Sequence, residues 1–112
     1  MKGWTRVCRL DEIPPLGSRM VCRPEGRVAV FRTKHDHVFA LADRCPHRGG
    51  PLSQGIVHGN RVTCPLHDWI VDLPSGRAVA PDEGAVATYA VRIEDNTVFV
   101  ATAPVRAEAA NA

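Results

Sequence analysis

The sequence lacks the features that mark several large classes of protein. No apolar stretch approaches the roughly 18–20 residues that a helix needs to cross a bilayer, and the segment 1–6 has no apolar core of a signal peptide. We therefore expect a cytoplasmic protein without a membrane partner. A glycine-rich phosphate loop, a nucleophile elbow and a dinucleotide fingerprint are also missing, so we expect no catalytic residue in this chain alone.

A large excess of charge of one sign is also absent. The formal net charge is +2, which is too small to suggest a nucleic-acid partner. The basic residues are unevenly placed, because ten of the 14 Lys and Arg residues lie in residues 1–56. Such an uneven distribution of charge favours docking to a partner protein, although ordinary solvated side chains explain it equally well.

Long helices are not indicated anywhere in the chain. The 112 residues include nine Gly and nine Pro, and no segment has helical periodicity beyond one or two turns. The apolar residues instead fall into short alternating or continuous runs that turn residues separate. We expect strands over residues 4–10, 27–32, 37–42, 61–64, 69–73, 77–80, 88–93 and 98–102.

Short strands at close spacing predict an all-β fold, an antiparallel β-sandwich or barrel. We expect one domain over residues 1–105, with no internal repeat or linker. The remaining residues, 106–112, are small and polar and are expected to form a flexible tail.

Two short motifs carry most of the chemical information. Cys45-Pro46-His47 and Cys64-Pro65-Leu66-His67 together form the pattern C-x-H-x16-C-x2-H. Each motif follows an expected strand and opens a loop, so the two loops can meet around one metal centre. Two thiolates and two imidazoles can bind a [2Fe–2S] cluster with both sulfurs on one iron and both nitrogens on the other, the arrangement of a Rieske centre.

The residues beside these ligands suit an iron–sulfur cluster. Gly49 and Gly50 allow the backbone to approach inorganic sulfide and donate hydrogen bonds to it. Pro65 restricts the second loop, and Trp69 can shield the cluster from water. Because neither loop has a further cysteine, no disulfide can join the loops, and we expect a reduction potential at the lower end of the Rieske range of roughly −150 to +300 mV.

A zinc-binding structural or regulatory module is the competing explanation of the same four side chains. Two Cys and two His can form a tetrahedral zinc site. Zinc motifs typically pair like ligands, as C-x2–4-C or H-x3–5-H, and the alternation of Cys and His in this chain favours iron.

The remaining cysteines and histidines have simpler explanations. Cys8 and Cys22 each lie in an expected strand and are predicted to be buried free thiols. His35 lies in an expected hairpin turn and is predicted to be solvated. His37 and His58 are predicted to be exposed or structural.

The segment CPHRGGPLSQGIVHGNRVTCPLHDWIVDLPSGRAVAPDEGAV resembles the Rieske [2Fe–2S] proteins. Within them it is similar to the small subunit of assimilatory NAD(P)H-dependent nitrite reductase (NirD type). The run PLHDWIVDL, followed by a turn glycine and PDEG, distinguishes this group from the Rieske ferredoxins of aromatic-ring-hydroxylating dioxygenases. The likeness extends from about Trp4 to Ala101, and a stand-alone ferredoxin of such a dioxygenase stays the alternative.

This resemblance implies a Rieske-type sandwich with a small cluster-binding subdomain of two loops, at about residues 43–70. It implies that Cys45 and Cys64 bind one iron of a single [2Fe–2S] cluster, and that His47 and His67 bind the other. The implied partner is a large subunit that carries FAD, sirohaem and a [4Fe–4S] cluster. Together the two subunits would reduce nitrite to ammonium with electrons from NAD(P)H in nitrate assimilation, and the small subunit would only transfer electrons.

Overall fold

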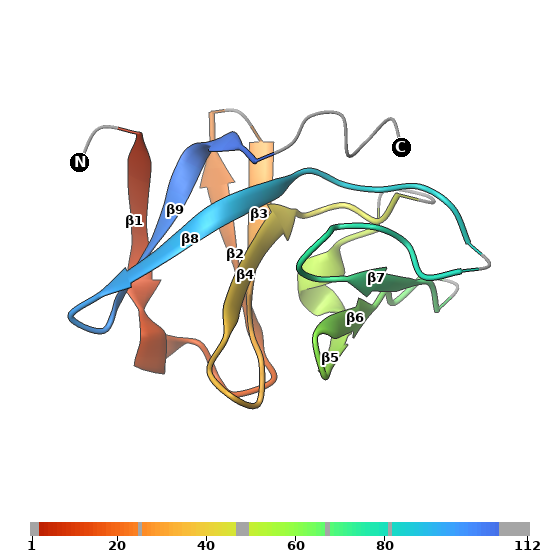
Figure 1. Ribbon diagram of the computed structural model, residues 1–112, viewed down its shortest axis with the longest axis horizontal. Helices are drawn as coiled ribbons and strands as arrows, with labels where there is room; N and C mark the ends of the chain where they lie inside the picture. The colour runs from red at the N-terminus through yellow and green to blue at the C-terminus, as the bar shows by residue number, and fades with distance from the viewer. Residues whose placement is uncertain (1–2, 25, 47–49, 67, 81, 106–112) are drawn as a thin grey trace.

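The structure, a computed structural model, describes residues 3–24, 26–46, 50–66, 68–80 and 82–105. Its strands form two antiparallel sheets, which confirms the predicted all-β class (Figure 1). The expected tail 106–112 lies outside the described residues, as do three of the expected site residues, His47, Gly49 and His67.

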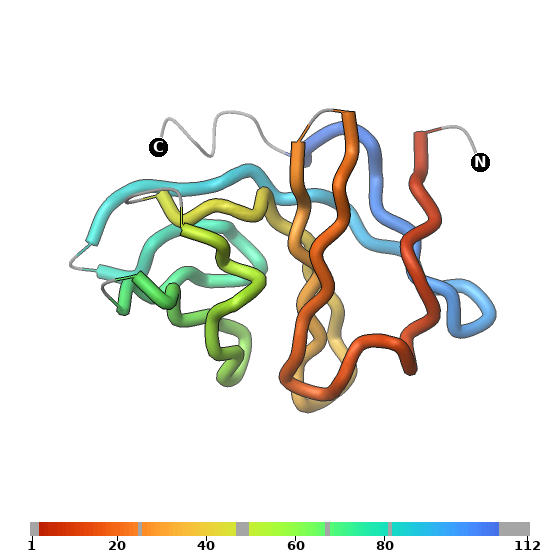
Figure 2. Tube along the Cα trace, turned by 180° about the vertical axis from the view of Figure 1, so that it is seen from behind, coloured from red at the N-terminus to blue at the C-terminus, as the bar shows by residue number. Residues whose placement is uncertain are grey.

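The larger sheet has six strands in the order β1-β9-β8-β4-β3-β2. They are β1 (Trp4–Arg9), β2 (Ser18–Arg23), β3 (Gly26–Arg32), β4 (Val38–Ala42), β8 (Thr88–Glu94) and β9 (Thr97–Pro104). The β8–β9 hairpin turns at Asp95 and Asn96, both with positive φ, and these residue types tolerate that backbone conformation better than most. Its two edge strands, β1 and β2, lie next to each other in sequence, so the sheet curls back on itself (Figure 2).

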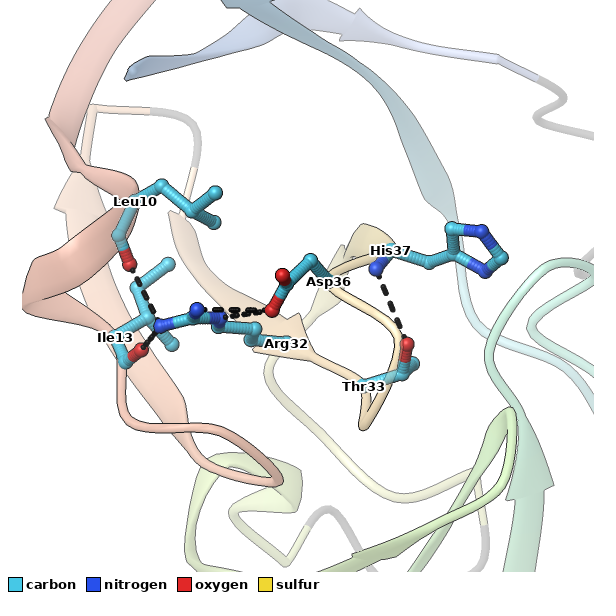
Figure 3. Close-up of polar contacts among 6 residues, drawn as sticks. All are labelled: Leu10, Ile13, Arg32, Thr33, Asp36 and His37. Atoms are coloured by element: carbon cyan, nitrogen blue, oxygen red, sulfur yellow. Dashed lines mark hydrogen bonds and ion pairs between the residues drawn. The ribbon is translucent and has the colours of Figure 1, made fainter.

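Two arginines span the gap between the sheet edges. From β2, Arg23 donates a hydrogen bond to the carbonyl of Ala101 in β9 at 2.9 Å and stacks over the Tyr89 ring. From β3, Arg32 donates to the carbonyls of Leu10 and Ile13 at 3.3 and 2.6 Å (Figure 3). The Arg32 contacts fix the β1–β2 connection, which includes the 3₁₀ helix η1 (Leu10–Glu12), against the end of the sheet.

The smaller sheet has three very short strands in the order β5-β6-β7. These are β5 (Ile56–His58), β6 (Arg61–Thr63) and β7 (Ile70–Asp72). Their central residues Val57, Val62 and Val71 are paired across the sheet and buried. The flanking side chains point to the opposite, more exposed face, as the two-residue period of a strand requires.

Strand β3 joins the two regions because it is buried on both faces. Val28 and Val30 pack into a core with Cys8, Ile13, Ala40, Val98 and Val100. Their neighbours Ala29 and Phe31 point the other way, into a second core that includes Leu41, Leu52 of the 3₁₀ helix η2 (Leu52–Gln54), and the three valines of the small sheet. Burial on both faces explains the continuous apolar run of this strand.

The expected strands over 27–32, 37–42 and 88–93 correspond to β3, β4 and β8 within one residue at each end. Residues 77–80 were expected to form a strand, but they form only isolated bridges, at Arg77 and Ala78. The two 3₁₀ helices were not predicted. Within the described ranges, no helix has the length and apolar character needed to span a membrane.

Candidate metal centre

Two of the four predicted ligands, Cys45 and Cys64, lie in the described residues, each just after a strand of a different sheet. Both loops are closed in the same way. The Cys45 N–H donates to the Gly50 carbonyl at 2.7 Å, and the Cys64 N–H donates to the Trp69 carbonyl at 2.7 Å. Each cysteine therefore begins a turn that is tied shut by the residue five positions later.

The two cysteine side chains lie together in the core between the sheets. Cys45 is 2% exposed and Cys64 is fully buried, and all four cysteines are free thiols. The Leu66 N–H donates a hydrogen bond to the Cys64 sulfur at 3.4 Å. Burial raises the pKa of the Cys64 thiol, the Leu66 N–H partly opposes this rise, and the adjacent Cys45 side chain adds to it.

The position of Gly50 shows how closely the two loops approach. A Cβ atom at this residue would lie 2.7 Å from Cδ1 of Leu66 and 3.2 Å from the Cys64 sulfur. A side chain at this position would have to displace the Leu66 side chain, so glycine suits the close approach of the two loops. Two buried sulfurs, one of which accepts a backbone N–H and lies close to Gly50, suit a thiolate-bound cluster that needs amide hydrogen bonds.

Sequence reasoning missed a side chain that holds the first loop. Asp43 is 3% exposed, and its carboxylate accepts hydrogen bonds from the Ser53 N–H at 2.8 Å and the Ser53 hydroxyl at 2.7 Å. The pair joins the residue after β4 to η2 and so brackets the segment that contains Cys45. A buried carboxylate needs such partners, but nothing in the sequence pairs Asp43 with Ser53.

The other neighbours of the site are partly exposed. Trp69 packs against the core that contains both cysteines, whereas Pro65 is exposed and Leu66 is 42% exposed. On the other side, a Cβ at Gly84 would lie 3.0 Å from Cβ of Pro46. Gly84, the last residue of PDEG, therefore lies against Pro46 of the first ligand motif.

The structure separates the remaining cysteines and histidines from this site. Cys8 is buried in the other core, as predicted. The prediction for Cys22 is wrong, because β2 is an edge strand and the Cys22 side chain is exposed, with Met20 as its neighbour at 3.6 Å between the sulfurs. His35, His37 and His58 are exposed.

No group of three or more His, Cys, Asp or Glu side chains that could hold a metal is found within the described residues. Two of the four predicted ligands, His47 and His67, lie outside those residues. The described part of the site consists of two adjacent thiols at the ends of two loops, which fit half of a Rieske ligand set.

Comparisons with known proteins all point to the same family. Residues 3–101 match the family described as Rieske-like [2Fe-2S] domain. The chain is 31% identical over 98 residues to the ferredoxin component of the naphthalene 1,2-dioxygenase system of Pseudomonas aeruginosa, covering 87% of this chain and 93% of that protein.

Two solved structures are similar over nearly their whole length. The ferredoxin of carbazole 1,9a-dioxygenase from Nocardioides aromaticivorans IC177 is 27% identical, with a TM-score of 0.82 over 89% of this chain and 98% of that one. A Mycobacterium tuberculosis protein proposed to be the small subunit of an NADH-dependent nitrite reductase is 26% identical, also with a TM-score of 0.82, over 91% and 96%.

Proposed function

The chain belongs to the family of Rieske-like [2Fe-2S] domains, and from this premise we propose that it is the electron-transferring small subunit of an NAD(P)H-dependent nitrite reductase. A Rieske [2Fe–2S] cluster is the cofactor of this domain. We propose that Cys45 and Cys64 hold one iron and that His47 and His67 hold the other. When bound, this cluster accepts and releases one electron at a time.

The described residues position and protect such a cluster. The backbone closures at Cys45 and Cys64 set the directions of the two sulfurs, and the Asp43–Ser53 pair holds the base of the first loop. The Leu66 N–H stabilises negative charge on the Cys64 sulfur. Trp69 excludes water from the inner side of the site, because it packs on the core beneath both cysteines.

The observation that carries the nitrite reductase assignment is the position of the PDEG segment. In the sequence, this segment and PLHDWIVDL distinguish the nitrite reductase group from dioxygenase ferredoxins. In the structure, Gly84 of PDEG has a φ of +123° and lies against Pro46 of the first ligand motif. The similarity to the M. tuberculosis protein over most of both chains supports the same assignment.

A stand-alone ferredoxin of an aromatic-ring dioxygenase is the second candidate. It is favoured by the 31% identity to the naphthalene dioxygenase ferredoxin over 93% of that protein. Both candidates transfer electrons through the same kind of cluster and differ only in the protein that receives them. Both candidate functions are compatible with the cytoplasmic location that the sequence predicts.

The two candidates are separated by the proteins that bind the native chain. We expect affinity purification from the source cell, grown on nitrate, to yield a large subunit that contains sirohaem, and the pair to oxidise NAD(P)H in the presence of nitrite. A Cys64→Ala protein mixed with the same large subunit should support little nitrite reduction, because it lacks the cluster. Recovery of a flavin reductase and an oxygenase, with no sirohaem, would contradict the assignment and favour the second candidate.

A further inference from the structure

The loop that carries Cys64 is the tip of the β6–β7 hairpin. Thr63 pairs with Ile70 across the two strands, and the Cys64 N–H donates to the Trp69 carbonyl at 2.7 Å, which extends this pairing by one residue. Residues 65–68 therefore connect two antiparallel strands. Connections of three to five residues are commonly built around a type I turn, and in the shortest of these a residue in the left-handed conformation completes the reversal of the chain.

Asp68, the last residue of this connection, has that left-handed backbone conformation. Its φ is +57°, and among the other described residues of the loop, 64–66 and 69, no φ is positive. The left-handed region is unfavourable for most residues because Cβ approaches a carbonyl oxygen, whereas glycine enters it freely and Asp and Asn tolerate it. The residue type at position 68 therefore affects how easily the loop closes at Cys64.

Asp68 also brings a negative charge to the ligand loop. It directly follows the proposed ligand His67 in the chain, its side chain is exposed, and within the described residues it forms no ion pair. Burial is the main cause of the raised pKa of the Cys64 thiol, and the Asp68 carboxylate adds to that rise. The carboxylate therefore opposes the build-up of negative charge at the Cys64 sulfur.

We propose that Asp68 is a positioning residue of the second ligand loop and that it also lowers the reduction potential of the cluster. Its backbone closes the loop at Cys64. Its carboxylate disfavours the reduced state, because reduction adds one negative charge to the cluster. The inference rests on the ligand set given in the proposed function, but it does not depend on which partner, nitrite reductase or dioxygenase, exchanges electrons with the cluster.

Three substitutions separate the charge of Asp68 from its backbone conformation. Asp68→Asn and Asp68→Gly remove the charge but keep a residue that tolerates a φ of +57°, whereas Asp68→Ala removes the charge and strains the turn. In redox titrations of the holoproteins, we expect all three to favour the reduced state about threefold, a rise of about 28 mV for a one-electron couple. Only the Ala variant should release iron to a chelator faster, by about fivefold.

Asp95 provides the matched control. It is also an exposed aspartate with a positive φ, +49°, and it lies in the β8–β9 turn, at the end of the large sheet away from the small sheet and its loops (Figure 1). Asp95→Asn changes the net charge equally. At an ionic strength of about 0.15 M, where charges more than about 8 Å apart are largely screened, it should leave the reduction equilibrium within about 1.2-fold of the wild type. Asp95→Ala should leave the rate of iron release unchanged.

The outcomes distinguish this inference from the proposed ligand set. A wild-type protein without iron and acid-labile sulfide overturns both. If the wild type holds the cluster and Asp68→Asn leaves its potential unchanged, or shifts it no more than Asp95→Asn does, the Asp68 carboxylate does not tune the potential. If Asp68→Ala and Asp68→Gly release iron at the same rate, the left-handed backbone does not position the loop. An unchanged visible spectrum of the Asn variant shows that a shift in potential is not caused by a lost ligand.

Discussion

The two sheets of this protein are stabilised in different ways. The six-stranded sheet has strands of five to eight residues and a core of its own, formed by residues such as Val28, Val30 and Val98. The three-stranded sheet has strands of three residues each, shorter than a typical strand of about five or six. Its core is shared with β3 and β4 and includes both Cys45 and Cys64.

This difference shows how a rigid framework can carry a region that does not fold well alone. The large sheet contributes Ala29, Phe31 and Leu41 to the core beneath the small sheet. The rest of that core consists of small-sheet and loop residues, among them the two cysteines. Because metal binding can supply folding free energy, we infer that the small sheet depends on the cluster and that the large sheet does not.

The largest effect should follow from removing one ligand. We expect Cys64→Ala to lower the iron and acid-labile sulfide per chain to below about a tenth of the wild-type content, because the cluster needs all four ligands. Elemental analysis with a sulfide assay measures this loss. Cys22→Ala is the control, since Cys22 is exposed on an edge strand of the large sheet. Wild-type iron content in the Cys64 variant would remove Cys64 from the ligand set.

Removing the cluster should loosen one sheet more than the other. In the apo protein we expect amide hydrogen exchange in β5–β7 to become roughly tenfold faster or more, with protection in β3, β4, β8 and β9 largely retained. Exchange followed by NMR or mass spectrometry measures the two regions separately. Equal loss of protection in both sheets would show that the large sheet depends on the cluster as well.

A smaller effect should follow from removing the Asp43 carboxylate. Asp43→Ala leaves the Ser53 N–H without its partner, and we expect the free energy of unfolding to fall by about 1–3 kcal/mol and cluster release to become faster. Asp72→Ala is the matched control, because Asp72 accepts the same two kinds of bond from Ser75. Equal rates of iron release from the Asp43 and Asp72 variants would show that the Asp43–Ser53 pair does not hold the cluster loop in particular.

The last prediction concerns two thiols of the large sheet and should leave the cluster and the fold unchanged. Burial raises the pKa of the Cys8 thiol, and that side chain is 3% exposed, whereas Cys22 is exposed. In the holoprotein at pH 8, we expect Cys22 to react with a disulfide reagent about a hundredfold faster than Cys8, or more. Cys22→Ala should abolish the fast phase. A fast phase that persists in this variant would mean that Cys8 is accessible.

The sequence predicted those parts of the fold that have a strong local signal. The β3–β4 hairpin follows from two apolar runs and a polar turn, and β8–β9 from alternation and the Asp95-Asn96 turn. Residues 77–80 were assigned as a strand on the same kind of signal, but they lie beyond the three-stranded sheet and form only isolated bridges.

The candidate site was predicted only in part. The motif spacing identified Cys45 and Cys64, and the structure brings them together between the sheets. The exposure of Cys22 was predicted wrongly, because an edge strand cannot be recognised from its own residues. The Asp43–Ser53 pair depends on how two separate segments pack, and no pattern within either segment indicates it.

The central claim is that the two loops hold a [2Fe–2S] cluster, and the metal content of the native protein tests it most directly. We expect the chain, purified without oxygen, to contain about two iron and two acid-labile sulfide per molecule, and Cys64→Ala to contain neither. One zinc per chain with no sulfide, in a protein with the same strand content, would contradict the account.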